Sequence, residues 1–190
     1  MSEGEALQEL PLFGGASASM TAEVSLESEL VARVRNGDQE AFAELYRKYA
    51  PTIHAVVLSR VPRDEVQDIV QEVFLAAYRK IETLRNDGVF GPWIVKIARN
   101  RAIEFYRRLR ATDELNEELS QKGNRRDEAA EVLRAIRSLS DAYSETLIMR
   151  LVEGMSAKEI AARTGLKPES VRVNLHRGME LLRKSLGTIR

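Results

Sequence analysis

Helical periodicity is the feature that most constrains the fold of this chain. Apolar residues recur three and four positions apart between Leu30 and Arg110, and the same spacing resumes at about Asp127. One such run consists of Val66, Ile69, Val70, Val73 and Phe74. No stretch of useful length alternates polar and apolar residues as a half-buried strand does. The pattern predicts an all-α protein.

Interruptions of this periodicity predict the domain boundaries. Residues 1–26 mix small residues with scattered acids and predict a mobile acidic tail. Residues 111–127 lose the apolar stripe and predict a flexible linker. We therefore expect two small helical domains, at residues 27–110 and 128–187, the second of them a helix-turn-helix.

Capping and turn residues divide the first domain into four or five expected helices. Asp38 and Asp64 are predicted N-caps, because a short acidic side chain can accept the unpaired N–H groups of a first turn. Pro51 is predicted to interrupt a helix, whereas Pro92 suits the first turn of a helix that continues through Trp93.

The overall charge conceals two basic blocks. The formal net charge is zero, which by itself argues against a nucleic-acid partner. Residues 79–110, however, carry nine basic and three acidic residues, and residues 156–190 carry eight and three. Residues 1–29 carry six acids and no base. Because local fields decide which ligands approach, the two blocks favour a polyanionic partner. The acidic tail could shield them, or it could be a solvated extension.

Composition excludes several other classes. The chain has no cysteine, which excludes a disulfide framework, a thiol nucleophile and a cysteine-ligated metal site. No apolar run approaches the ~18 residues that cross a membrane. Glu3, Glu5 and Glu9 stand where a signal peptide has basic residues. We therefore expect a cytoplasmic protein without membrane insertion.

The segment from Gly154 to Arg177 carries the most specific local signal. Ser156 and Glu159 form a predicted capping box. A small residue, a turn glycine and a core valine follow at helix-turn-helix spacing, and these are Ala161, Gly165 and Val171.

The second helix of this motif has an outward face suited to DNA. With Val171 and Leu175 facing inward, we expect Arg172, Asn174 and Arg177 on the outward side, where such residues can reach base edges and phosphates. A helical hairpin used only for packing or dimerisation is the alternative.

Residues 89–110 interleave aromatic and basic side chains. Lys96, Arg99, Arg107 and Arg108 can neutralise phosphates, Asn100 can pair with a base edge, and Phe90 could stack on an unpaired base. The alternative is a solvated basic helix. A neighbouring segment is acidic and apolar-backed, which suits docking of a protein; its polar residues include Asp68, Gln71 and Glu72.

Four segments resemble, in order, four motifs of bacterial sigma factors of the extracytoplasmic-function (ECF) group. They are residues 36–42 (NGDQEAF), 68–74 (DIVQEVF), 93–100 (WIVKIARN) and 175–177 (LHR). The resemblance covers roughly residues 27–110 and 128–186, and it implies a sigma factor.

This resemblance implies partners and site residues. The first domain would bind the clamp helices of the largest subunit of core RNA polymerase through Asp68, Gln71, Glu72 and Phe74. The flap of the second-largest subunit would be a further contact. At the promoter −10 element the implied residues are Asn86, Phe90, Lys96, Arg99, Asn100, Arg107 and Arg108, and at the −35 element they are Arg172, Asn174 and Arg177. The family assists promoter melting without ATP, so no cofactor, metal or catalytic residue is implied. Its members are commonly held by an anti-sigma protein.

Two other classes of function remain as alternatives. A transcriptional regulator with a C-terminal helix-turn-helix would explain residues 130–190 and leave the basic and aromatic segment unused. An enzyme would need a catalytic constellation, but the two histidines, His54 and His176, are far apart in sequence and no phosphate loop or nucleophile motif accompanies them. We do not expect an enzyme.

Overall fold

Two groups of helices make up the protein. The computed structural model describes residues 15–113 and 128–189, and within these ranges it contains helices and no strand, which confirms the predicted all-α class. The first group consists of α1 (Gly15–Arg35), α2 (Gln39–Leu58), α3 (Val66–Lys80) and α4 (Phe90–Asp113). Three short 3-10 turns join its members, at η1 (Arg63–Glu65), η2 (Ile81–Thr83) and η3 (Asp87–Val89). The second group consists of α5 (Glu128–Arg137), α6 (Asp141–Leu151), α7 (Ala157–Thr164) and α8 (Pro168–Ile189).

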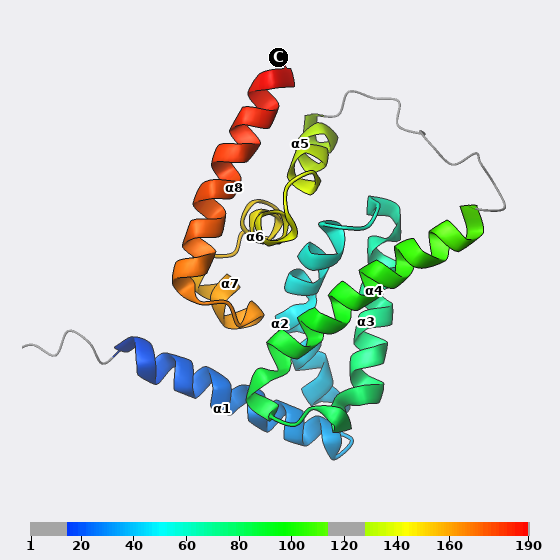
Figure 1. Cartoon of the computed structure of the whole chain (residues 1–190). Helices are drawn as coiled ribbons and strands as arrows, with labels where there is room; N and C mark the ends of the chain where they lie inside the picture. Colours follow the sequence, from blue (N-terminus) through cyan, green and yellow to red (C-terminus); the bar gives the residue numbers. More distant parts are fainter. Residues whose placement is uncertain (1–14, 114–127, 190) are drawn as a thin grey trace, which may run out of the picture.

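Helix α2 is the centre of the first group. It packs against α1, α3 and α4, and Figure 1 shows α4 crossing α2 and α3. Leu45 and Ile53 of α2 and Ile94 of α4 are fully buried in this core. Each such side chain contributes roughly 1.5–3 kcal/mol through removal of its apolar surface from water. No helix of the described ranges is long and apolar enough to cross a membrane.

The helix boundaries agree with some of the predicted caps and not with others. Asp38 is the N-cap of α2: its carboxylate accepts from the backbone N–H of Ala41 at 3.1 Å and pairs with Arg33 at 2.8 Å. These bonds, the backbone one first, lower the pKa of Asp38. Asp64 is not a cap, because it lies inside η1. Pro51 does not end a helix either, because α2 continues through it.

The predicted mobile tail is wrong from Gly15 onward, because α1 begins there. The carboxylate of Glu27 is 6% exposed; it accepts from Lys48 Nζ at 3.0 Å and from the Tyr49 hydroxyl. It also accepts from the backbone N–H of Gly91 at 3.4 Å. An acid of the proposed shield is therefore a structural link between α1, α2 and α4. Residues 1–14 lie outside the described part of the chain.

The boundary between the domains also differs slightly from the prediction. Helix α4 continues to Asp113, three residues beyond the expected end of the first domain, and α5 begins at Glu128. The remainder of the predicted linker, residues 114–127, lies outside the described ranges.

The predicted helix-turn-helix is confirmed as α7 and α8. Ser156 Oγ accepts from the N–H of Glu159 at 3.2 Å, and the Glu159 carboxylate accepts from the N–H of Ser156 at 2.8 Å. The second bond is the main reason why the pKa of Glu159 is lowered. Gly165 ends α7 with φ of 72°, a left-handed conformation that a side chain disfavours. Val171 of α8 is fully buried.

Loss of the capping box should destabilise the second domain. Ser156→Ala removes an acceptor for a first-turn N–H group, so we expect a loss of about 1 kcal/mol in the free energy of unfolding. Urea denaturation followed by circular dichroism measures it. Ser25→Ala, the same change at an exposed position within α1, is the control and should be near neutral. Equal destabilisation by both substitutions would contradict a contribution from the cap.

Candidate nucleic-acid interface

The outward face of α8 is exposed and partly basic. Arg172 and Arg177 are exposed, as predicted, but Asn174 is partly buried. At about 100° per residue, Asn174 lies roughly 160° around the axis from Arg172, on the opposite flank of the helix. Val173, which is 45% exposed, lies between the two arginines on the outward face. Sequence analysis missed it, although the inward positions of Val171 and Leu175 already place it outward.

A second exposed stripe follows α4. Lys96, Asn100 and Arg107 are exposed and lie on one side of this helix, since they are spaced four and seven residues apart. Ile103 lies within the same stripe and is 62% exposed, whereas its apolar character predicts packing. Arg108 lies further around the axis and pairs with Glu72 of α3 at 3.4 Å. The stripe combines charge, an amide and one apolar side chain, which suits a nucleic acid.

Phe90 is not available to stack on a base. Its side chain is fully buried, with its ring centroid 5.3 Å from that of Tyr49 and 5.7 Å from that of Trp93. From sequence alone, an aromatic residue next to a basic helix can be either exposed for stacking or packed in the core. Phe90 packs in the core. Val89, 40% exposed, is the apolar side chain that the adjacent turn presents to solvent.

The turn before α4 is held by its own Asn86 and by Arg35 of α1. The Asn86 carboxamide oxygen accepts from the N–H of Gly88 at 3.0 Å and begins η3. Asp87 pairs with Arg35 of α1 at 2.8 Å, and Arg35 also donates to the carbonyl of Leu84. The turn that the resemblance assigns to the −10 element is thus fixed against α1.

Helix α3 presents an acidic and apolar surface. Asp68 and Gln71 are exposed and Glu72 is partly exposed, as a docking surface requires. Phe74 is only 3% exposed and packs on Tyr46 and Phe42, so the expectation that it touches a partner is wrong for this structure.

Other apolar side chains of this region reach solvent instead. They are Tyr46, Leu75 and Tyr78, whose exposed fractions are 43%, 48% and 43%. Sequence analysis did not select them. The sequence shows that these residues belong to the apolar stripes of α2 and α3. It does not show which residues of a stripe lie at its edge and therefore reach solvent.

Charged side chains join the two helical groups, and sequence analysis missed them. Arg99 of α4 donates to both carboxylate oxygens of Glu145 in α6, from Nε at 3.0 Å and from Nη2 at 2.7 Å. This bond is the main reason why the pKa of Arg99 is raised. Arg60 pairs with the same carboxylate at 2.5 Å and with Asp141 at 2.8 Å. Pairs so distant in sequence leave no local signal.

Arg137 of α5 attaches the second group to the end of α2. It donates to the carbonyl of Leu58 at 2.8 Å and to that of Val61 at 2.7 Å. A cation at the C-terminus of a helix satisfies carbonyls that have no partner within the helix. Burial lowers the pKa of this guanidinium.

Backbone contacts complete the junction at the helix-turn-helix. A Cβ built on Gly165 would lie 2.6 Å from Pro92, and one built on Gly91 would lie 2.6 Å from the carbonyl of Arg163. The turn between α7 and α8 therefore packs directly on the first turn of α4.

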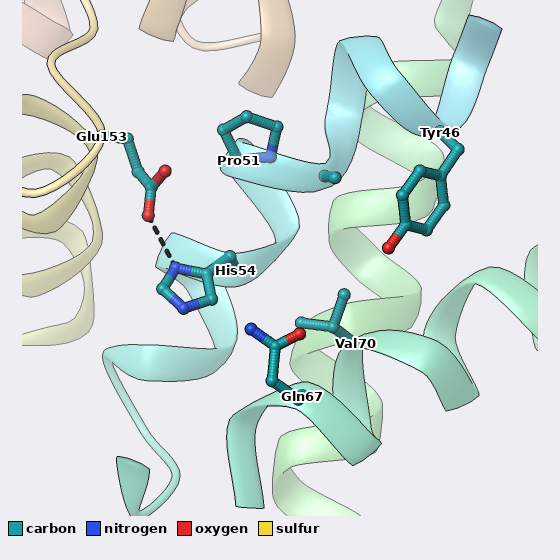
Figure 2. A pocket seen from close by; sticks show the side chains of 7 residues that line it. Tyr46, Pro51, His54, Gln67, Val70 and Glu153 are labelled. Carbon is teal, nitrogen blue, oxygen red and sulfur yellow. Dashed lines mark hydrogen bonds and ion pairs between the residues drawn. The ribbon is translucent and has the colours of Figure 1, made fainter. Parts of the chain in front are cut away.

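An open cleft of about 380 Å³ lies at the border of the two groups. Figure 2 shows His54 of α2 and Glu153, which follows α6, pointing toward one another across it, with Nδ1 2.6 Å from the carboxylate. Tyr46, Pro51, Gln67 and Val70 form the rest of the labelled lining. His54 and Glu153 thus join the two groups of helices at this cleft.

Comparison with known proteins identifies both groups of helices. Residues 45–112 match the family described as Sigma-70 region 2, and residues 129–182 match Sigma-70, region 4. The chain is 30% identical over 167 residues to RNA polymerase sigma factor CarQ of Myxococcus xanthus, an alignment that covers 83% of this chain and 95% of the relative. It is 31% identical over 172 residues to the ECF RNA polymerase sigma-E factor of Escherichia coli K12, covering 80% and 90%.

Solved structures show the same arrangement. The chain superimposes on CnrH in complex with the cytosolic domain of CnrY with a TM-score of 0.60 and 25% identity, over 86% of this chain and 98% of that one. The sigma factor RpoE of Bartonella quintana, in complex with the anti-sigma factor NepR, shares the fold with a TM-score of 0.50 at 21% identity, over 78% and 98%. Residues 45–112, from within α2 to α4, carry region 2 and α5–α8 carry region 4, so this chain belongs to the ECF group of the sigma-70 family of RNA polymerase sigma factors.

Proposed function

We propose that this protein binds core RNA polymerase and directs promoter-specific initiation by reading a −10 and a −35 element and assisting DNA melting. The observation that carries the proposal is the presence of two exposed basic faces, on α4 and α8, in two domains of one chain. A duplex-binding regulator needs only the second face. The first, with its exposed amide and apolar side chain, suits unpaired bases as well.

The −35 element is proposed to contact the outward face of α8. Arg172 and Arg177 can donate to guanine edges or to phosphates, and Val173 between them can contact a thymine methyl group. Asn174 lies on the partly buried flank of α8, so it is proposed to contact a phosphate or a base at the edge of the site.

The −10 element is proposed to follow the stripe on α4. Lys96 and Arg107 would contact phosphates on either side of Asn100, which would contact a base edge, and Ile103 would pack on an unstacked base. Each base captured by stacking is worth ~1–3 kcal/mol, which is the energy available for strand separation without ATP. Arg99 and Arg108 would join this surface after leaving their present carboxylate partners.

The clamp helices of the polymerase are proposed to dock on α3. Asp68 and Gln71 supply polar contacts there, and the exposed Tyr46, Leu75 and Tyr78 supply apolar area. Aromatic side chains ringed by polar groups are the usual centre of a protein interface. The flap of the second-largest subunit is proposed to contact the second domain.

Regulation by an anti-sigma protein is proposed from the relatives. The two superimposed structures are CnrH bound to the cytosolic domain of CnrY and the sigma factor RpoE bound to the anti-sigma factor NepR. A partner of this kind would compete with polymerase for the same surfaces of the two domains.

The function is tested by run-off transcription. Core RNA polymerase is incubated with and without this protein on a pool of promoter fragments from its genome. Transcripts that depend on the protein, and that share upstream sequence, are the expected result. No transcript together with no co-elution with core polymerase would overturn the proposal in favour of an operator-binding regulator.

Reversal of charge on the docking surface should abolish polymerase binding. Asp68→Arg places a cation where we propose a complementary contact, so we expect at least about a 30-fold loss of affinity for core polymerase, as at an interface hot spot. Fluorescence anisotropy of labelled protein measures it. Glu29→Arg, an exposed acid of α1 with the same change of charge, is the control. Unchanged polymerase affinity in Asp68→Arg would remove α3 from the interface.

Truncation of the α8 arginines should separate base reading from phosphate contact. Arg172→Ala or Arg177→Ala should weaken binding of the holoenzyme to its −35 sequence by ~1–3 kcal/mol if the side chain reads a base. On a fragment with a substituted −35 element, the variant holoenzyme should then bind with nearly the same affinity as the unchanged holoenzyme. Equal weakening on both fragments would identify a phosphate contact instead. Arg134→Ala, an exposed arginine of α5, is the control for loss of charge.

A further inference from the structure

Glu145 is placed where its negative charge joins the two domains. Its side chain is 5% exposed and both of its oxygens are occupied: Arg99 binds it in the two-pronged manner, and Arg60 adds a third bond. The arginines come from α4 and from the segment after α2, whereas Glu145 comes from α6. The cluster consists of Arg60, Arg99 and Glu145, and we refer to it as the Glu145 cluster.

The Glu145 cluster occupies a proposed DNA contact. A guanidinium fork that is filled by a carboxylate cannot at the same time bind a phosphate in the same geometry. Arg99 is 40% exposed, but its Nε and Nη2 both point to Glu145. DNA would therefore have to displace Glu145 in order to recruit Arg99.

The distance between promoter elements requires the two domains to separate. The −10 and −35 elements lie about 25 base pairs apart, or roughly 85 Å along a straight duplex. In this structure the turn of the helix-turn-helix packs on Pro92 at the start of α4. A compact chain of this length has a radius of gyration of about 16 Å, which is far too small to span both elements. The covalent connection between Asp113 and Glu128 permits separation, because a chain of that length extends to about 50 Å.

We propose that the Glu145 cluster is a latch that holds the two domains closed, in a form that cannot engage both promoter elements. For the identity of Arg99 as a DNA contact, this inference rests on the proposed function. The latch is polar on both sides: Arg60 and Arg99 each reach water when the domains part, and Glu145 does as well. Binding of polymerase or DNA can therefore open it without leaving a buried charge unpaired, whereas loss of Glu145 alone removes the carboxylate between Arg60 and Arg99 and leaves Asp141 as the acid paired with Arg60.

Other contacts across the junction support the closed form without occupying the DNA-binding stripe. His54 pairs with Glu153, and Arg137 binds the carbonyls at the end of α2. The latch is distinguished from them by Arg99, the one proposed DNA contact among the charged contacts of the junction in the described ranges.

The experiment measures closure directly, without polymerase. The chain has no native cysteine, so Lys80→Cys on α3 and Glu180→Cys on α8, both exposed, carry a donor and an acceptor dye. High energy transfer is expected in the otherwise unchanged protein. Glu145→Gln should shift the ratio of closed to open molecules by at least about tenfold toward open, because it leaves Arg99 without its carboxylate and Arg60 with Asp141 alone. Glu40→Gln is the control: it removes the same charge from an ion pair with Arg47 within α2.

A second measurement tests whether Arg99 is released. Binding of the free protein to a random-sequence 30-base-pair duplex should tighten severalfold more in Glu145→Gln than in Glu40→Gln, since both lose one negative charge but only the former frees Arg99. Arg60→Gln tests the other side of the cluster and should also lower energy transfer, which keeps the test valid if Glu145→Gln fails to fold. Unchanged energy transfer in the folded variants would overturn the latch. Absence of run-off transcripts would instead overturn the proposed function, and the closure measurement would stand apart from it.

Discussion

The structure depends on the burial of the C-terminal end of α2 from more than one side. Five consecutive residues of its last two turns, from His54 to Leu58, include four that are at most 5% exposed. A helix with one solvent face cannot bury consecutive residues, so this segment must be covered from more than one direction. Helices α1, α3 and α4 cover one part and α6 and α7 cover the other. The same element is therefore the core of region 2 and the platform on which region 4 rests.

Charge at this junction has two roles that oppose one another. Two of the arginines that we propose as DNA contacts pair with acids in this structure. Arg99 and Glu145 meet across the domains, and Arg108 and Glu72 meet within the first. Part of the balanced net charge of the chain thus has a structural counterpart, because Arg99 and Arg108 each pair with an acid of the same chain.

Local sequence signals predicted local structure well. The capping box of Ser156 and Glu159, the left-handed Gly165 and the N-cap Asp38 are all decided by bonds within a few residues, and each is confirmed. The same reasoning failed at Asp64 and Pro51, because packing of the surrounding helix overrides a single turn or breaker residue. It failed at Phe74 and Phe90 because an aromatic on an apolar stripe can belong to the core or to its edge, and the sequence does not distinguish them.

By itself, the sequence determined the helical class, the two domains, the helix-turn-helix and the outward position of its arginines, because each follows from periodicity and short-range bonding. Only the tertiary structure decided which apolar residues reach solvent, as Ile103, Val173 and Leu75 do. It also decided that Arg99 faces Glu145 and that Glu27 is buried beneath α4. These outcomes depend on contacts between segments tens of residues apart. Such contacts are selected by the packing of whole helices, and no periodicity of a single helix encodes its partner.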